Sequence, residues 1–133
     1  VVPRLVQQAL LNEPLTVFGD GSQRRCFCHV SDVSEAILGL VSTPEAEGQV
    51  FNVGGRDEIS INNLALRIKE IVGSSSELEF IPYERAYEVG FEDMQRRRPD
   101  TSKVHKALEW VPQRNLDDII HDVARDLVTR ASM

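Results

Sequence analysis

The chain has 133 residues, which is the size of one ordinary domain and enough to bury a hydrophobic core. Hydrophobic residues at 41% and charged residues at 27% are typical of globular proteins. The formal net charge of −6 argues against sequence-independent binding of nucleic acid, because that binding needs clustered positive charge. No apolar run reaches the length of a transmembrane helix and no signal peptide opens the sequence, so we expect no membrane partner.

The two cysteines, Cys26 and Cys28, are separated by one residue. Side chains two apart on a strand point the same way, so a disulfide between them would be strained, and we expect a cytoplasmic protein. The sequence starts without Met and already shows helical periodicity in its first residues. This start favours a piece of a longer chain.

The first half of the sequence predicts helices and short strands in alternation. Apolar residues at helical spacing indicate the helices, and short apolar or alternating runs between turn residues indicate the strands. Residues 49–53 are almost continuously apolar, as in a strand that is covered on both faces. The predicted elements are a helix that Pro3 begins and Pro14 stops, strands over 15–18, 24–30 and 49–53, and a helix through Val41 with Ser31 as its N-cap.

The second half predicts three more helices and one more strand. Between them, residues 82–99 are polar with scattered aromatic side chains, and a loop of this length in a compact domain is either disordered or functional. We therefore predict a helix-rich α+β fold with several short strands. The predicted elements here are a helix from Ser60 to Gly73, a strand over 78–81, a short helix capped by Asp100 or Thr101, and a final helix that Asn115 and Asp118 cap.

The stretch GDGSQRRCFCHVSD, residues 19–32, invites several chemical interpretations. It is not a dinucleotide-binding fingerprint, because Arg24 stands where the third glycine belongs and no helix follows. The two cysteines and His29 lack a second ligand pair at zinc spacing, so we assign no metal. As a turn it can direct one arginine at an anion, since Arg24 and Arg25 point to opposite faces of a strand. The pattern alone favours a hairpin with two solvated arginines.

No residue of this chain is predicted to be catalytic. Ser31 and Ser60 are interpreted as helix caps, and no G-x-S-x-G motif is present. The arginine run 96–98 favours a solvated or salt-bridged segment, because four acidic residues lie within 84–93. The alternative for this arginine run is a groove that binds a polyanion. DNA binding is disfavoured by the net charge.

The order of the motifs carries more information than any one of them. The collinear stretches are PLTVFGDGSQRRCFCHVSDVSEAIL, FNVGG, ISINNLALRIKEIVG and RRRPDTSKVHKALEWVP. Together they resemble the C-terminal half of extended short-chain dehydrogenase/reductase enzymes, the NAD-dependent nucleotide-sugar epimerases, 4,6-dehydratases and UDP-glucuronate decarboxylases. The resemblance covers essentially all 133 residues.

This resemblance implies that residues 1–133 are a nucleotide-sugar-binding C-terminal domain, detached from its Rossmann domain. NAD and a Tyr-x-x-x-Lys pair belong to the N-terminal Rossmann domain, which is missing from this chain. Neither Tyr83 nor Tyr87 is followed by lysine at that spacing. We therefore expect this chain to bind no NAD by itself and to be inactive alone.

The resemblance also implies which residues contact the substrate. The family's G-x-G-x-Q-x-R motif matches residues 19–25, and its arginine, here Arg25, contacts the pyrophosphate. Gly90 stands where some relatives carry a second arginine to the pyrophosphate, and Arg96 is a possible substitute. Asp32 of the VSD segment matches a structural aspartate. The implied substrate-binding residues are Arg25, Gln23, Thr16, Val17 and Phe18 near the base and diphosphate, Asn52 near the diphosphate, Asp93 at the ribose, and Arg96.

The implied partner is a UDP- or TDP-sugar, whose C4 is oxidised by NAD in the other domain before inversion, elimination or decarboxylation. The sequence leaves the sugar, the base and the outcome of the reaction open. The resemblance implies a homodimer for the full-length protein, and the isolated piece is expected to self-associate through uncovered apolar surface. The alternative is a non-catalytic interaction module that uses residues 82–99 to bind an anionic or protein partner.

Overall fold

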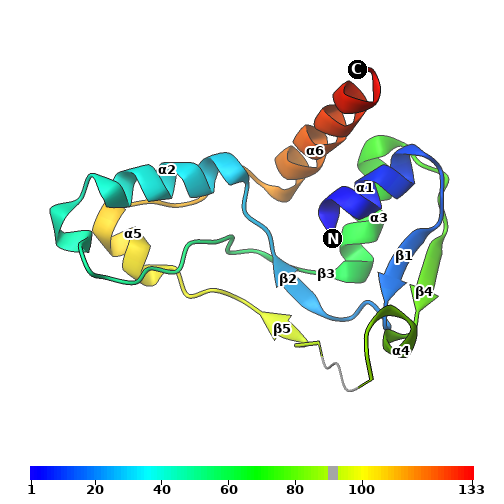
Figure 1. The fold of residues 1–133 in the computed structure, drawn as a ribbon, viewed down its shortest axis with the longest axis horizontal. Coiled ribbons are helices and arrows are strands. Elements are labelled where there is room, and N and C mark those ends of the chain that lie inside the picture. Colours follow the sequence, from blue (N-terminus) through cyan, green and yellow to red (C-terminus); the bar gives the residue numbers. More distant parts are fainter. Residues whose placement is uncertain (90–92) are drawn as a thin grey trace. The chain divides into compact units, whose positions relative to one another are not determined.

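A computed structural model describes residues 1–89 and 93–133 (Figure 1). Helices predominate and the strands are short, which confirms the predicted helix-rich α+β class. None of the described helices is both long enough and apolar enough to cross a membrane. The helices are α1 (Val2–Leu10), α2 (Val30–Val41), the 3-10 helix η1 (Pro44–Ala46), α3 (Ile61–Val72), α4 (Tyr83–Ala86), α5 (Ser102–Leu108) and α6 (Leu116–Ala131). The strands are β1 (Leu15–Phe18), β2 (Arg24–Cys26), β3 (Glu58–Ser60), β4 (Leu78–Ile81) and β5 (Arg96–Arg97).

The chain forms two compact units, and each unit is assembled from separate stretches of sequence. Unit 1 consists of Val1–Arg25, Ile59–Arg96 and Ile120–Met133. Unit 2 consists of Cys26–Glu58 and Arg97–Ile119. The chain passes from one unit to the other within β2, β3, β5 and α6. The three strands form a sheet in the order β3-β2-β5.

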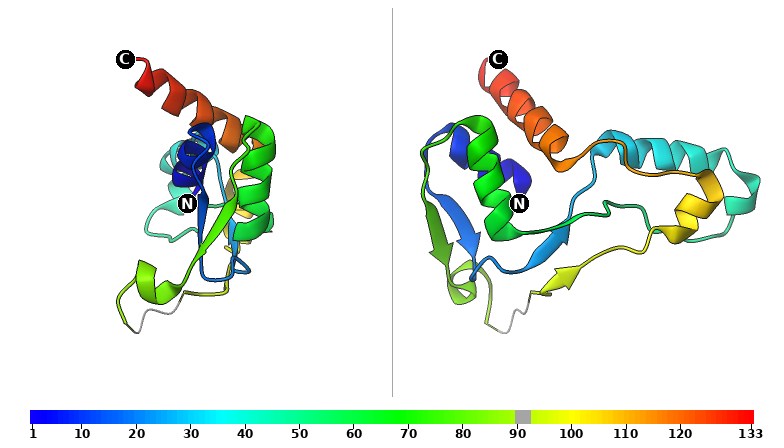
Figure 2. Two further views of the ribbon diagram at one scale, coloured as in Figure 1. Left: turned by 90° about the vertical axis from the view of Figure 1, so that its right-hand side faces the viewer. Right: turned by 180° about the vertical axis from the view of Figure 1, so that it is seen from behind.

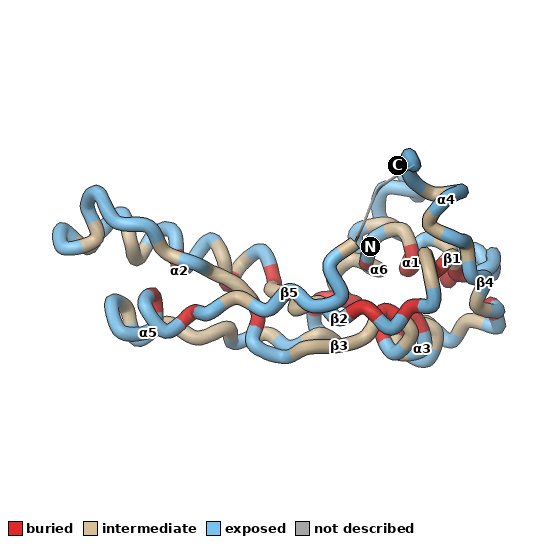
Figure 3. The backbone as a smooth tube through the Cα atoms, turned by 90° about the horizontal axis from the view of Figure 1, so that it is seen from below, coloured by how far each residue is buried: buried red, intermediate tan, exposed pale blue. Residues whose placement is uncertain are grey.

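The core of unit 1 is a pair of parallel strands covered by two helices. Leu15 of β1 lies opposite Leu78 of β4, and Figure 2 shows the two strands side by side in the same direction. Helices α1 and α3 pack against each other and against β1. Their apolar stripes supply most of the buried residues of this unit, and Figure 3 colours buried residues red. A fully buried Leu or Ile side chain contributes about 1.5–3 kcal/mol. The buried apolar residues of α1, β1 and α3 are Val2, Leu5, Val6, Ala9, Leu15, Val17, Ile61, Leu64, Ala65 and Ile68.

The ends of α3 follow the predicted signals. Ser60 Oγ accepts a hydrogen bond from the Asn63 amide at 3.2 Å, as an N-cap does. At the other end, Gly73 adopts a left-handed conformation with φ of 67°, which ends the helix. Both predicted boundaries are therefore confirmed.

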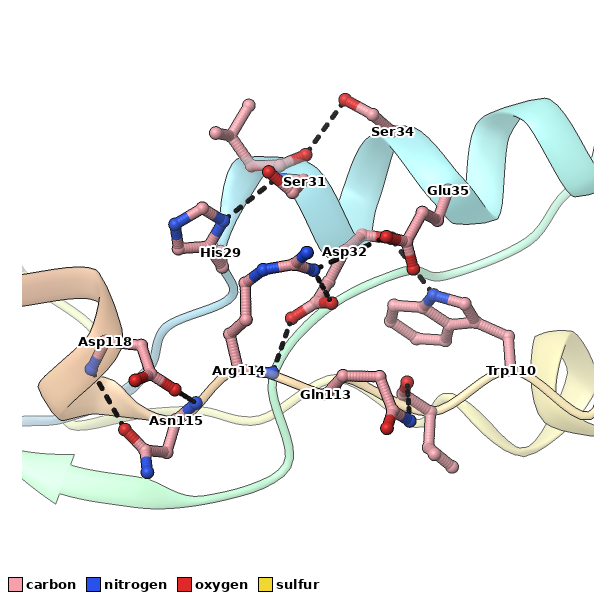
Figure 4. Close-up of polar contacts among 12 residues, drawn as sticks. His29, Ser31, Asp32, Ser34, Glu35, Trp110, Gln113, Arg114, Asn115 and Asp118 are labelled. Atoms are coloured by element: carbon pink, nitrogen blue, oxygen red, sulfur yellow. Dashed lines mark hydrogen bonds and ion pairs between the residues drawn. The ribbon is translucent and has the colours of Figure 1, made fainter. Parts of the chain in front are cut away.

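Unit 2 is organised around Asp32, a fully buried residue in the first turn of α2. Figure 4 shows the polar contacts of this residue. Its Oδ1 accepts from Arg114 Nη1 at 2.7 Å, and its Oδ2 accepts from the Arg114 backbone amide at 3.0 Å. The Trp110 indole donates to the Asp32 carbonyl at 3.0 Å. One carboxylate thus ties the start of α2 to the segment after α5, which confirms the structural role expected for Asp32.

The N-cap of α2 differs from the prediction. The helix begins two residues earlier than expected, and His29, not Ser31, is its N-cap. The His29 Nδ1 atom accepts from the Ser31 backbone amide at 3.1 Å, so Ser31 is the donor in this cap (Figure 4). A histidine ring nitrogen fills the acceptor role that a hydroxyl usually fills, and the preference for serine at N-caps gave the wrong residue.

Two predicted strands also need correction. Residues 49–53 form no strand, and 24–30 is a strand only over Arg24–Cys26. A strand exists only where a neighbouring strand supplies hydrogen bonds, and no strand among the described residues pairs with 49–53. The predicted loop 82–99 contains α4 and β5, and β3 was not predicted.

Candidate functional site

The turn between β1 and β2 in unit 1 is the centre of the candidate site. Gly19 and Gly21 adopt left-handed conformations, with φ of 68° and 72°. Asp20 Oδ1 accepts from the Ser22 amide and hydroxyl at 2.9 and 2.6 Å, which stabilises the turn locally. Gln23 is 5% exposed, and its Nε2 donates to the Phe18 carbonyl at 3.1 Å. The buried amide therefore bridges the two ends of the turn.

Arg25 follows this turn and is held by a carboxylate. Its Nη2 donates to Asp93 Oδ1 at 2.5 Å, and its Nη1 donates to the Arg24 carbonyl at 2.7 Å. The two side chains are 15% and 17% exposed, whereas Arg24 is exposed, as expected for opposite faces of a strand. Arg25 is therefore not the solvated arginine that the pattern alone favoured.

Tyr83 supports this ion pair from α4. Its ring lies against Gly19, where a Cβ atom would come within 2.4 Å of Tyr83 Cε2. Its hydroxyl donates to Asp93 Oδ2 across a long contact of 3.5 Å. Burial, followed by the charge of Asp93, raises the pKa of Tyr83, so the hydroxyl keeps its proton and remains a donor.

The three predicted residues of β1 have different surroundings. Val17 is fully buried, so its side chain belongs to the core. The Thr16 amide donates to Gln8 Oε1 at 3.1 Å, and the Thr16 carbonyl accepts from Arg4 Nη2 at 2.9 Å. Phe18 is partly exposed, with the Arg4 guanidinium 4.2 Å from its ring centroid. A hollow of about 510 Å³ beside the turn is lined by Gly19, Asp20, Phe80 and Pro82.

The remaining predicted residues lie outside this cluster. Arg96 is exposed in β5, next to Gln95, whose carbonyl accepts from the Arg24 amide at 2.8 Å. Asn52 is exposed and belongs to unit 2. Gly90 lies outside the described residues. The structure therefore brings Arg25 and Asp93 together, and places Gln23 and Phe18 at the same turn.

Sequence reasoning missed Tyr83, Arg4 and Asn62. Asn62 lies at the start of α3 and donates from Nδ2 to the Asp20 carbonyl at 2.8 Å. Arg4 lies in a helix that the sequence marked only by its apolar stripe. These residues contact the turn or β1 from distant parts of the sequence, and single-sequence periodicity holds no signal for such contacts.

This arrangement suits anion binding better than bond-breaking chemistry. A guanidinium has five N–H donors in a planar fork that matches phosphate oxygens, and Asp93 and the Arg24 carbonyl use only part of this capacity. Within residues 1–89 and 93–133, no group of three or more His, Cys, Asp or Glu side chains is placed to hold a metal ion. The cluster can therefore hold and orient an anionic ligand.

A family model and several curated proteins match most of this chain. A family model described as GDP-mannose 4,6 dehydratase matches residues 1–123. A UDP-N-acetyl-alpha-D-glucosaminuronate decarboxylase from Bacillus cytotoxicus is 38% identical over 112 residues, which are 84% of this chain and 35% of that protein. UDP-glucuronic acid decarboxylase 1 from Arabidopsis thaliana is 32% identical over 130 residues, which are 98% of this chain and 28% of that protein. The chain thus spans about a third of the length of these curated relatives.

A solved structure of a nucleotide-sugar epimerase also matches this chain. The crystal structure of UDP-glucuronic acid 4-epimerase from Bacillus cereus, in complex with UDP-glucuronic acid and NAD, superposes with a TM-score of 0.80 at 28% identity. The match covers 93% of this chain and 39% of that one. The chain therefore belongs to the extended short-chain dehydrogenase/reductase family of nucleotide-sugar epimerases and dehydratases, and it corresponds to the C-terminal part of these proteins.

Proposed function

We propose that this chain is the substrate-binding portion of an NAD-dependent nucleotide-sugar epimerase, dehydratase or decarboxylase. Arg25 holds the diphosphate of a UDP- or TDP-sugar, and Asp93 accepts a hydrogen bond from the ribose. NAD and the residues that transfer protons and hydride lie in a second domain, N-terminal to this chain. The UDP-sugar bound by the Bacillus cereus epimerase supports this substrate class.

One observation carries the proposal: a half-buried guanidinium is fixed next to a glycine turn by a carboxylate that is itself part of the site. The 2.5 Å contact with Asp93 restricts the rotation of the Arg25 side chain before ligand arrives. A preordered guanidinium loses less conformational entropy on binding phosphate than a mobile one. Its remaining N–H groups form charge-assisted hydrogen bonds, which are stronger than neutral ones.

The binding energy gained at the diphosphate then serves the reaction at the sugar. A nucleotide held at Arg25 and at β1 leaves the sugar as the part of the substrate that reaches the second domain. Contacts remote from the reacting carbon can thereby align C4 with the nicotinamide, which accepts the hydride. Inversion, elimination or decarboxylation at the 4-keto sugar is decided by side chains of that domain.

The test is a titration of UDP and TDP into the chain and into the full-length protein that contains it. Loss of a charge-assisted hydrogen bond of about 1.5–3 kcal/mol predicts that Arg25→Ala weakens UDP binding about 10- to 100-fold. Arg24→Ala is the matched control, because it removes the same charge from the neighbouring, exposed side chain. Equal affinity of wild type and Arg25→Ala in the full-length protein would overturn the proposal.

A further inference from the structure

The turn that precedes Arg25 is anchored by the first residues of α3, which lie about 40 positions further along the chain. The Ile61 amide donates to the Gln23 carbonyl at 3.0 Å. The Asn62 amide donates to the Gly21 carbonyl at 3.0 Å, and the Asn62 side chain donates to the Asp20 carbonyl at 2.8 Å. The free N–H groups that begin any helix are therefore used here to hold one turn.

Asn62 holds this turn with both its backbone and its side chain. It donates to two successive carbonyls, those of Asp20 and Gly21. The packing is close, because a Cβ atom on Gly21 would lie 2.0 Å from Asn62 Oδ1 and 2.7 Å from Val17 Cγ1. The side-chain amide of Asn62 therefore packs tightly against the turn, with no room for a side chain at Gly21.

The position of this turn determines where the next strand begins. Gln23 is fixed at its carbonyl by α3 and at its side chain by Phe18, and Arg25 follows two residues later. A hydrogen bond to phosphate weakens steeply with changes in distance and angle. A turn released at Asp20 and Gly21 would let the start of β2 shift, and the Arg25 guanidinium would shift with it.

We infer that Asn62 is a positioning residue for the Arg25 guanidinium: it contacts no substrate itself, but it holds the turn that sets the phosphate-binding geometry. This inference rests on the proposed function. The sequence alone predicts no role for Asn62. Through its hydrogen bonds to the Gly19–Gln23 turn, the N-terminus of α3 would influence how Arg25 meets the ligand.

The experiment measures UDP affinity for Asn62→Asp and Asn63→Asp. Asn62→Asp keeps the shape of the side chain but removes the donor to the Asp20 carbonyl. Asn63→Asp is the matched control, because it adds the same charge one residue later, where the side chain is exposed. Both changes place a carboxylate in the first turn of α3, which favours the helix, so a loss of binding is not a loss of helix.

Loss of one hydrogen bond of about 1 kcal/mol predicts that Asn62→Asp weakens UDP binding about fivefold, while Asn63→Asp changes it less than about twofold. In the Arg25→Ala background, Asn62→Asp should have no further effect, because residues that act as one unit are not additive. A residue that merely stabilises the fold would weaken binding in both backgrounds.

Each outcome bears on one of the two proposals. Equal effects of Asn62→Asp and Asn63→Asp, or an additive effect with Arg25→Ala, would overturn the positioning role and leave the function of Arg25 intact. An Arg25→Ala chain that binds UDP normally would overturn the proposed function instead. If Asn62→Asp unfolds, as judged by circular dichroism, Asn62→Ala replaces it under the same criteria. Unfolding of both variants would assign Asn62 to the fold and refute the inference.

Discussion

Replacement of Asp32 by asparagine tests whether one buried carboxylate stabilises unit 2. Asp32 is fully buried, and Asn has the same shape but carries no charge. In Asp32→Asn, an amide nitrogen replaces one of the two oxygens that accept from the Arg114 guanidinium at 2.7 Å and the Arg114 backbone amide at 3.0 Å. One donor therefore faces another donor at a buried position.

The expected loss follows from those two contacts. Removal of one partner of a buried ion pair costs about 3–5 kcal/mol. Arg114 is 37% exposed and can regain water, so the lower end of this range applies, about 3 kcal/mol. Because a domain is stable by only about 5–15 kcal/mol, this is a large share of the total.

The effect should also depend on pH. Burial alone would raise the pKa of Asp32, but hydrogen bonds from the backbone amides of Arg114 and Gln113 and from the Arg114 guanidinium lower it below its ordinary value. A carboxyl whose pKa is lower in the folded state stabilises the fold fully above its unfolded pKa of about 3.9. This contribution is lost as the pH falls through the folded pKa, so wild type and variant should converge in acid.

Urea unfolding of both proteins between pH 7 and pH 3 gives the required free energies. Glu35→Gln is the matched control, because Glu35 is an exposed second partner of the same guanidinium at 3.4 Å and should change stability by less than about 1 kcal/mol. A loss of less than about 1 kcal/mol for Asp32→Asn at pH 7, or a difference that does not shrink in acid, would refute the reasoning.

Two further substitutions test local features of each unit. In unit 2, Gly55→Ala places a Cβ atom 2.0 Å from the Phe27 carbonyl oxygen, so urea unfolding should show a loss of about 1–3 kcal/mol; an unchanged midpoint would contradict this contact. In unit 1, Ser60→Ala removes the cap of α3 and should cost about 1 kcal/mol, whereas Ser60→Gly should cost only a few tenths; equal losses would argue against the cap.

Elements with local signals could be predicted from the sequence. The strands Leu15–Phe18 and Leu78–Ile81 agree with the structure, as do Ser60 and Gly73 at the ends of α3. The reciprocal cap of α6 is also confirmed, because the amide of Asn115 donates to Asp118 and the amide of Asp118 donates to Asn115, each at 2.9 Å. Such signals depend on residues that lie within one turn of each other.

Features that depend on distant residues could not be predicted in this way. The apolar run 49–53 was predicted as a strand from its composition, but pairing is a property of two segments, and the described chain offers it no partner strand. In the site, the motif indicated Arg25, whereas the contacts of Tyr83 and Asn62 arise only when segments some 40 to 65 positions away return to the turn. The resemblance placed Asp93 at the ribose but gave no sign of its contact with Arg25.

The interleaving of the two units limits how this protein can be dissected. The backbone crosses between them after Arg25, Glu58, Arg96 and Ile119, so neither unit is a continuous stretch. A truncation at any of these four crossings removes at least one segment from a unit. Truncation before Ile120, for example, would remove a segment of unit 1 although the preceding residues belong to unit 2. A fragment designed for expression should therefore contain all four crossings in one polypeptide.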